Sequence, residues 1–376
     1  MYGYINDLFK IITGEATTGK IKRETYRNMN LERNHRHMKK ISSFLITIVL
    51  VLITMPGLAQ TPARPTDKIE WHGYTQLWAS TNFDNTYSVA LRRLKFWMTS
   101  GPAFSEHWSF NVQAIFTSMG HEKFFLQNAF GQYRNKSGVS SVRFGQFIPK
   151  FSLQYFQHDY LMSSIERANI IMAGIPDGTL GVRDLGAQYT LKAAKKHLEV
   201  NFGLFNGYGI KQYRLNDGGG YLLTHNLSYT IKRKNALWKF GYSVMFRKAV
   251  KLELKHILPD SVLFSGNDFR YDVYAMFNSK HFDIQGEYLS GWLNGNRFDG
   301  YYALATIKAN AKNEVYLSYE KYNDLISSTS NNPWFITGYN YLIKHHDIML
   351  TLDTRFQKDN GRLNNITSLQ FQIFFH

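Results

Sequence analysis

Apolar and polar residues alternate with a period of two along most of the chain after residue 67. In segment 108–116, Trp, Phe, Val, Ala and Phe form one face, and Ser, Asn, Gln and Ile form the other. Segment 237–247 repeats the pattern, with Trp238 and Phe240 on the face opposite Lys239. A helix would place its apolar residues every three or four positions, so this alternation predicts β-strands.

About sixteen such runs follow Lys68, each near the ~10 residues that a tilted membrane strand needs. The connections after even-numbered runs are short and polar: 135–138, 193–196, 232–235, 279–280, 310–313 and 344–346. Those after odd-numbered runs are longer: 83–87, 148–181, 207–220, 249–266, 293–299, 324–332 and 357–364. This sorting predicts an all-β fold, a transmembrane antiparallel β-barrel of about 16 strands with short periplasmic turns and long extracellular loops.

The longest connection, 148–181, follows the fifth predicted strand. A loop of this length without clear secondary structure is normally functional. In a wide barrel we expect it to fold inward and narrow the lumen. The alternative is a long external loop.

The N-terminal part of the chain has the pattern of an export signal. From Met38 the sequence has two lysines, an apolar run from Phe44 to Met55, and small residues ending at Ala59. This is the layout of a secretory signal peptide, and the run is shorter than the ~20 residues of a transmembrane helix. We therefore expect an over-long N-terminal extension at 1–37, a signal peptide at 38–59 and the barrel at 60–376.

Composition supports an exported membrane barrel. Aromatic residues make up 16% of the chain although mean hydropathy is only −0.33, as expected when aromatic outer faces alternate with polar inner ones. The chain has no cysteine, which excludes disulfides, thiol catalysis and thiolate metal sites.

The formal net charge is +16, and without the nine Lys/Arg and four Asp/Glu of the first 60 residues it is 35 − 24, or +11. Inside a pore such an excess favours anions. The basic residues are scattered and form no recognised motif, so nucleic acid is not an expected partner.

Side-chain parity assigns charged residues to the lumen. Where Leu94 faces lipid, Arg93 and Lys95 point inward. Where Phe144 faces lipid, Arg143 also points inward. A charge on the lipid face costs roughly 2–4 kcal/mol at the midplane, so inward placement is favoured. The same rule assigns further charges to the lumen: Lys192, Lys239, Arg247, Arg270 and Arg355, with Asp272, Glu287, Glu320 and Asp353 as counter-charges.

We expect Arg93, Lys95 and Arg143, together with the loop residues Lys150, Arg167 and Arg183, to form a positive constriction that attracts anions. The alternative is that Arg and Glu on facing strands pair across the lumen and only stiffen the wall. Arg92 breaks the alternation and is expected near a rim, where its side chain would reach polar surroundings.

Several segments resemble one known family. They are 91–96 followed by 110–113, then 142–151, 201–207 and 285–288. In this order and spacing they resemble the phosphate-selective porin O and P family over most of the chain, from Ile69 to Phe375. The final residues 368–375, with alternating aromatics, look like the C-terminal signal that barrel-assembly machinery recognises.

The resemblance implies a sixteen-stranded barrel, usually a homotrimer, with a basic constriction, in the outer membrane of a Gram-negative bacterium. It does not by itself specify phosphate, because the family is broad. The expected function is therefore a porin for passive diffusion of small hydrophilic solutes, favouring anions, with outer-membrane lipid around it.

Other classes fit less well. An enzyme would need a nucleophile elbow or zinc-binding spacing, and neither occurs, so we expect no catalytic residue, metal or cofactor. A TonB-dependent transporter needs a plug domain for which the chain has no room, and a soluble sandwich would expose aromatic faces to water. The alternative that stays open is an outer-membrane barrel enzyme or receptor without open-channel activity.

Overall fold

The computed structural model describes residues 68–102, 104–175, 183–209, 219–254, 256–259, 262–326, 331–359 and 361–375. The expected extension at 1–37 and signal peptide at 38–59 lie outside the described residues.

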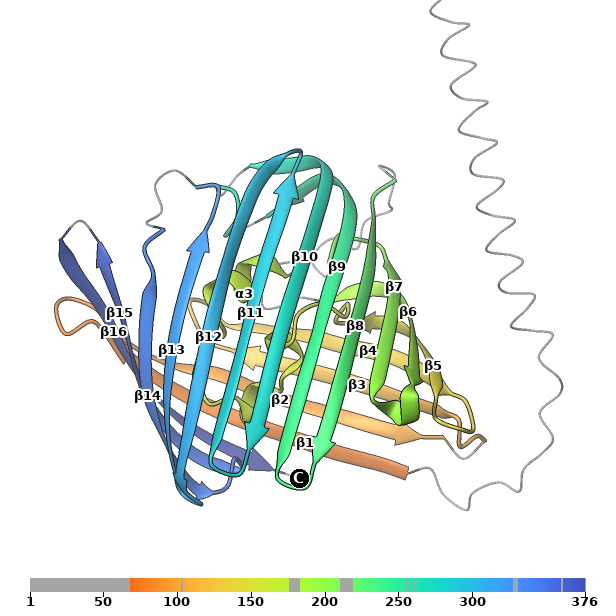
Figure 1. Cartoon of the computed structure of the whole chain (residues 1–376), viewed down its shortest axis with the longest axis horizontal. Coiled ribbons are helices and arrows are strands. Elements are labelled where there is room, and N and C mark those ends of the chain that lie inside the picture. The colour runs from red at the N-terminus through yellow and green to blue at the C-terminus, as the bar shows by residue number, and fades with distance from the viewer. Residues whose placement is uncertain are drawn as a thin grey trace, which may run out of the picture. The chain divides into compact units, whose positions relative to one another are not determined.

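Sixteen antiparallel strands form one closed barrel, in which each strand pairs with its sequence neighbours and β1 pairs with β16 (Figure 1). The predicted all-β barrel is confirmed. The strands are β1 Lys68–Thr81, β2 Tyr87–Gly101, β3 Trp108–Thr117, β4 Lys123–Arg134, β5 Ser140–Phe147, β6 Asp184–Ala193, β7 Leu198–Phe205, β8 Tyr221–Arg233, β9 Ala236–Glu253, β10 Leu263–Ser279, β11 Phe282–Leu293, β12 Asn296–Asn310, β13 Asn313–Asn323, β14 Trp334–Lys344, β15 Ile348–Asp359 and β16 Arg362–Phe375.

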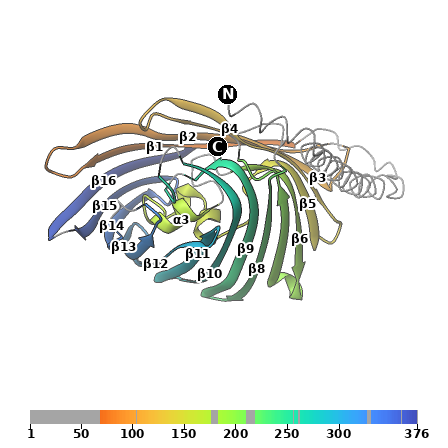
Figure 2. The same ribbon diagram turned by 90° about the horizontal axis from the view of Figure 1, so that it is seen from above.

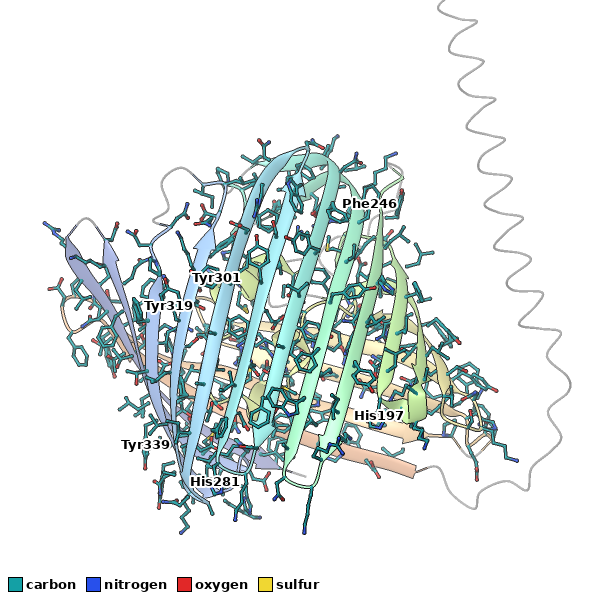
Figure 3. The ribbon with its side chains drawn as sticks, viewed as in Figure 1. His197, Phe246, His281, Tyr301, Tyr319 and Tyr339 are labelled. Atoms are coloured by element: carbon teal, nitrogen blue, oxygen red, sulfur yellow. The ribbon has the colours of Figure 1, made fainter. Side chains whose placement is uncertain are left out.

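The outer face of the barrel is apolar and aromatic, as the alternation predicts. On β9, Trp238 and Phe240 are 41% and 43% exposed, whereas the inward Ser243 is fully buried. Neighbouring outer aromatics touch, with the rings of Tyr301 and Tyr319 5.9 Å apart (Figure 3). Closure leaves no strand edge, so every strand can pair its backbone groups within the sheet, as a membrane requires.

Most connections follow the predicted sorting, but the one after β2, residues 102–107, is longer than those after β1 and β3, and two predicted loops are short. The expected long loop 293–299 is a tight turn at Asn294-Gly295, because Leu293 of β11 still pairs with Asn296 of β12. The expected loop 357–364 is short for the same reason, since Asp359 pairs with Arg362. Both predictions were wrong because the strands run on in register to the turn.

The segment after β5 folds into the lumen, as Figure 2 shows. It contains two short 3-10 helices, η1 Gln154–Phe156 and η2 Asp159–Leu161, and the α-helix α3 Asn169–Gly174, which contacts β11, β12 and β13. For residues 148–175 the inward prediction is confirmed. Among the described residues, no helix is long and apolar enough to cross a membrane.

An apolar core fills one side of the lumen. Ile170 and Ile171 of α3 and the following Ile175 are almost completely buried, together with Leu289 and Phe298 of the wall. Burying such a side chain contributes about 1.5–3 kcal/mol, so this packing favours the loop inside the barrel. The open part of the lumen must lie elsewhere.

A buried ionic group ties the end of α3 to the wall. Arg247 of β9 and Arg270 of β10 both donate to the carboxylate of Asp268, at 2.5 and 2.8 Å. Arg270 also donates to the carbonyl oxygens of Gly174 and Ile175, at 2.8 and 3.1 Å. The carbonyl groups at the end of the short helix are thus satisfied by a side chain of the barrel wall.

Asp268→Asn should therefore lower the free energy of unfolding by about 3–5 kcal/mol, because it leaves two buried guanidinium groups without their counter-charge. Urea unfolding of the protein refolded in lipid vesicles, followed by tryptophan fluorescence, measures the change. The control is Asp283→Asn, which removes a partly exposed pair with Lys308 and should cost about 0–1 kcal/mol. Equal losses for the two variants would contradict the structural role assigned to Asp268.

Candidate functional site

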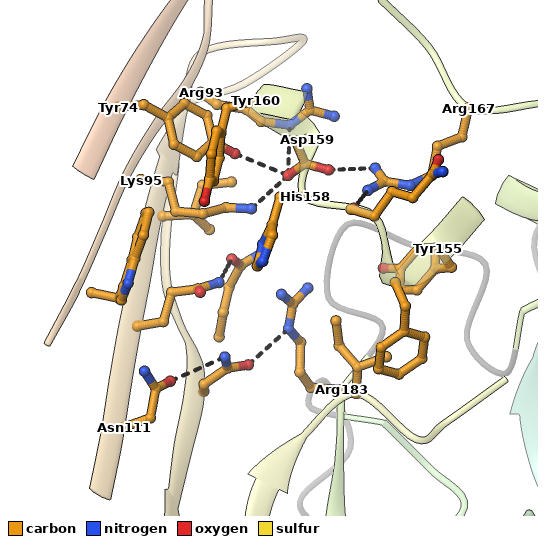
Figure 4. A pocket seen from close by; sticks show the side chains of 18 of the residues that line it. Tyr74, Arg93, Lys95, Asn111, Tyr155, His158, Asp159, Tyr160, Arg167 and Arg183 are labelled. Atoms are coloured by element: carbon orange, nitrogen blue, oxygen red, sulfur yellow. Dashed lines mark hydrogen bonds and ion pairs between the residues drawn. The ribbon is translucent and has the colours of Figure 1, made fainter. Parts of the chain in front are cut away.

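A cavity of about 260 Å³ lies in the lumen between the wall of β1–β5 and the inward loop (Figure 4). Its lining combines three kinds of side chain: cations, amides and aromatic rings. It lies opposite the apolar core that α3 forms with the β11–β13 side. This cavity is the candidate solute pathway.

A β-bulge in β2 brings two adjacent arginines into the lumen. Gln76 of β1 pairs with Arg93 and the next residue, Leu77, pairs with Leu91, so Arg92 is the extra residue. Strand parity therefore changes at this point, and both arginines are buried inside the barrel. The rim position expected for Arg92 was wrong, because alternation alone cannot reveal a bulge.

Arg92 connects the inward loop to the barrel wall. Its guanidinium lies 2.6 Å from the Glu166 carboxylate and donates to the side chain of Gln370 at 2.8 Å. The neighbouring Arg93 lines the cavity and donates to Gln76 at 2.9 Å.

A second bulge, in β4, adds amides to the same cavity. Gln113 of β3 pairs with Asn128 and the next residue, Ala114, pairs with Leu126, so Gln127 is the extra residue. Gln127 and Asn128 both line the cavity, whereas Leu126 faces outward. Bulges are common where a side chain must be re-aimed beside a site.

Three cations surround the carboxylate of Asp159, which lies at the tip of the inward loop (Figure 4). Lys95 lies 2.6 Å away, Arg93 lies 3.9 Å away, and Arg167 forms a further ion pair with it. Tyr74 of β1 donates its hydroxyl to the same carboxylate at 2.9 Å. Although burial acts in the opposite direction, these three positive charges hold the pKa of Asp159 well below its usual range. Asp159 therefore stays ionised and fixes the loop against β1 and β2.

An aromatic cluster surrounds the next residue, Tyr160. Its ring stacks on Trp97 at 6.2 Å and on His158 at 5.2 Å, and lies 4.8 Å from Phe374 of β16. The side chain of Gln372 donates to its carbonyl oxygen at 3.1 Å. The loop tip thus bridges β2 and the closing strand β16.

Three of the predicted cations form no ion pair with a carboxylate among the described residues. Arg183 donates to the amide oxygen of Asn128 at 3.2 Å. Arg143 donates to the amide oxygen of Gln132 at 2.9 Å and lies over the Phe130 ring at 4.3 Å.

The third is Lys150, whose amino group lies 4.0 Å above the centre of the Phe156 ring. Burial lowers the pKa of Lys150 to about 8, although the carboxylate of Glu199 opposes the shift. Its charge therefore varies near neutral pH.

The structure brings five of the six predicted constriction residues, Arg93, Lys95, Arg143, Arg167 and Arg183, to the cavity wall. Lys150 is not among the lining residues but contacts one of them, Phe156. Arg167 also donates to the backbone oxygens of Gln154 and Gln157, so it shapes the loop as well.

The further predicted lumen charges lie elsewhere. Glu287 accepts hydrogen bonds from the backbone of Leu153 and Gln154, at 2.7 and 2.6 Å, and holds η1. Arg247 and Arg270 belong to the buried group at Asp268.

The rest of that set is distributed around the wall. Lys192 lies 3.9 Å from Glu199 on the neighbouring strand, and Arg355 lies 4.0 Å from Glu320. Asp353 accepts a hydrogen bond from Tyr316. Asp272 is buried on β10 and Lys239 is half-buried on β9, and neither forms an ion pair with a described residue.

Sequence reasoning missed Asp159, Glu166, the aromatic cluster and the amide row. The two acids and Tyr160 lie in a loop without periodicity, so no pattern marks them. The amides were visible as polar strand positions at Asn111 and Gln113, but nothing in one sequence shows that they face the same cavity. Among the described residues, no group of three or more His, Asp or Glu could hold a metal.

Asp159→Asn should loosen the loop tip, because three cations then face one another without a shared counter-charge. Hydrogen–deuterium exchange of peptides spanning 154–161 should become at least about tenfold faster, which corresponds to ~1.4 kcal/mol of lost local stability. Asp84→Asn, at an exposed position in the connection between β1 and β2, is the control and should leave these peptides unchanged. Unaltered protection in Asp159→Asn would show that the aromatic cluster alone holds the tip.

No protein-family model and no curated protein sequence matches the chain. Solved structures of outer-membrane proteins do match. An anion-selective porin from Comamonas acidovorans matches with TM-score 0.58 and 10% identity, over 82% of this chain and all of that one. The outer membrane channel DcaP of Acinetobacter baumannii matches with TM-score 0.55 and 11% identity, over 85% of this chain and all of that one.

The trimer form of OmpT, an outer membrane protein of Vibrio cholerae, matches with TM-score 0.56 and 11% identity, over 82% of this chain and all of that one. At such identities the likeness concerns the fold. The chain thus has the β-barrel fold of Gram-negative outer-membrane porins.

Proposed function

We propose that the protein is an outer-membrane porin through which small hydrophilic solutes diffuse passively, with anions favoured. The observation that carries the proposal is the charge of the lumen cavity. Five cations line it against one carboxylate, Asp159, which leaves an excess of 5 − 1, or +4, among its described lining residues. Fixed positive charge in a narrow water-filled passage raises the local concentration of anions.

The barrel itself supports a membrane location. Its outer face carries exposed large hydrophobic residues on all sixteen strands, which suits surrounding outer-membrane lipid. The Comamonas porin of the same fold is described as anion-selective, and DcaP as an outer membrane channel. The resemblance to the phosphate-selective family adds phosphate as one candidate solute.

Two further parts of the proposal rest on relatives and on sequence. A homotrimer is proposed because OmpT of the same fold has a trimer form. Export through a signal peptide at 38–59 and insertion by barrel-assembly machinery, which would read residues 368–375, are proposed from the sequence.

The cations divide between two roles. Arg92, Arg167 and Arg270 hold the loop through carboxylates and backbone oxygens, as the structural alternative supposes. Arg143 and Arg183 have no carboxylate partner among the described residues and are the ones we assign to anion attraction. In this proposal, the arginines that hold the loop are therefore different residues from the arginines that attract anions.

The double variant Arg143→Gln/Arg183→Gln should lower the chloride-to-potassium permeability ratio several-fold, because it removes half of the excess charge in the cavity. Reversal potentials across a planar bilayer under a salt gradient measure this ratio. The control is Arg297→Gln, whose guanidinium is half exposed and pairs with Asp299, and it should leave the ratio unchanged. A folded protein that never conducts would contradict the porin, and would turn attention to a receptor or enzyme at the rim.

Anion preference should also decrease between pH 7 and pH 9. Lys150 releases its proton near its pKa of about 8, so the positive charge beside Phe156 is present below this pH and lost above it. The permeability ratio, measured by reversal potential at several pH values, should fall with a midpoint near pH 8 in the unmodified protein and fall by a smaller amount in Lys150→Met. A decline of the same size in both would assign the titration to another group.

A further inference from the structure

Two of the three side-chain types that line the cavity carry no charge. Amides of β3 and β4 face it in a row, with Trp97 of β2 beside Gln113 in the same wall, and the inward loop adds further aromatic rings. Their arrangement around Arg183 therefore bears on which anions the pore prefers.

The positive charges do not converge on one point. Lys95, Arg93 and Arg167 all face Asp159, whose carboxylate occupies the space between them. Arg183 forms no ion pair with Asp159 or with any other described carboxylate, and it points into the cavity, as Figure 4 shows. Arg143 is the second lining cation without such a partner. An incoming anion thus meets two guanidinium groups that no carboxylate neutralises, and each of them suits one carboxylate held by two parallel N–H groups. A phosphate ion, with more charge on its oxygens, is better served by several converging cations.

The amide row continues from Arg183. Its Nε donates to Asn128, which donates to Asn111 at 3.2 Å, and the neighbouring Gln113 donates to Gln127 at 2.6 Å. Asn111 also donates to the carbonyl oxygen of Met98 and to the hydroxyl of Thr99, both at 3.4 Å, so it offers mainly its oxygen to a solute. Asn128 uses one of its two N–H donors within the row, and each amide oxygen has a second lone pair. The row therefore presents both donors and acceptors to the cavity. Hydroxyl groups use both kinds of partner. An inorganic phosphate ion carries at most two hydroxyls near neutral pH, whereas a sugar acid carries several, so more groups of the sugar acid use both kinds of partner.

The rings offer a surface for the carbon skeleton of a solute. Trp97, Phe156, His158 and Tyr160 all line the same cavity as the amide row. Trp97 and Tyr160 stack on each other and on neighbouring rings. Phe156 and His158 each have one face covered, by Lys150 and by Tyr160, so the second face of these two rings is the one that can meet a solute. Half-buried aromatic faces cover apolar C–H groups while leaving polar groups at the edges in contact with water or amides. A ring-shaped solute with hydroxyls at its edge and C–H groups on its faces matches this division.

The size of the cavity limits the solute. Its volume of about 260 Å³ lies below the ~300–1,000 Å³ of pockets for drug-sized ligands. A single sugar ring bearing one carboxylate fits these dimensions, whereas an oligosaccharide would have to pass through one residue at a time.

We propose that the cavity is a selectivity site for small hydroxylated carboxylates of the sugar-acid class, with the carboxylate on Arg183, the hydroxyls on the row Asn111–Asn128 and the carbon face against the loop rings. The inference rests on the proposed porin function and names the solute class of that pore. The solute binds weakly and transiently, as passage requires.

The test uses the refolded protein in planar bilayers with potassium chloride, and compares four added solutes: glucuronate, glucose, acetate and inorganic phosphate. Glucuronate should block chloride current at concentrations at least tenfold lower than acetate or phosphate. Glucose, which lacks the carboxylate, should block more weakly than glucuronate. Equal block by glucuronate and acetate, or stronger block by phosphate, would overturn the sugar-acid assignment while leaving the pore intact. Absence of any conductance would instead refute the porin itself.

Two variants separate the parts of the site. Arg183→Gln should weaken block by glucuronate and by acetate alike, because both lose their carboxylate partner. Asn111→Leu, which keeps the branching of the side chain but removes its polar atoms, should weaken block by glucuronate several-fold and leave block by acetate unchanged. If Asn111→Leu weakened both equally, the amide row would have no role in recognising hydroxyls.

A binding measurement keeps the proposal testable if a variant conducts poorly. Isothermal titration of glucuronate into detergent-solubilised protein should give heat that Arg183→Gln abolishes and Arg297→Gln preserves. Circular dichroism with thermal melting shows that each variant is folded. Indistinguishable heats in a folded Arg183→Gln protein would count against the site.

Discussion

The carboxylate of Asp159 is the contact on which the organisation of the lumen depends. It lies at the tip of a loop that begins at β5 and reaches β1 and β2, where Tyr74, Lys95 and Arg93 meet it. A buried carboxylate is stable only when its charge is compensated, and here Arg167 of the loop itself supplies part of the compensation. The tip is therefore held at one place in the barrel, and the cavity beside it keeps a defined wall.

The opposite side of the loop is held by different forces. Isoleucines of α3 pack into an apolar core with Leu289 and Phe298, while Glu287 and Arg270 bind the loop backbone through hydrogen bonds. Burial of the apolar side chains stabilises the loop inside the barrel but does not depend on direction. The hydrogen bonds to its backbone fix the orientation of the loop. Together they hold this part of the loop against the wall opposite the cavity at β1–β5.

The two bulges show how a regular barrel makes an irregular site. A strand in strict alternation sends every second side chain into the lumen, so it cannot place adjacent residues there. The extra residues Arg92 and Gln127 remove this limit next to the cavity. One serves the loop through Glu166, and the other joins the amide row beside Gln113. One bulge residue therefore has a structural role and the other faces the solute cavity.

The sequence by itself determined the class of fold and most of the inward cations. Alternation with period two is a local property of each strand, so it identified the strands, the aromatic outer face and the inward direction of Lys95 and Arg143 without reference to other parts of the chain. It also marked the long segment after β5 as exceptional. It failed at Arg92, and at the turn Asn294-Gly295, because bulges and the continuation of pairing depend on the neighbouring strand.

Only the tertiary structure decided which charges are available to a solute. Arg270 and Arg183 look alike in sequence, yet one is sealed against Asp268 and α3, and the other points into the cavity. The difference arises because the loop approaches one wall with apolar residues and the other with Asp159 and aromatic rings. Such pairing joins residues more than sixty positions apart, as in Lys95 with Asp159, and no local pattern in the chain carries that information.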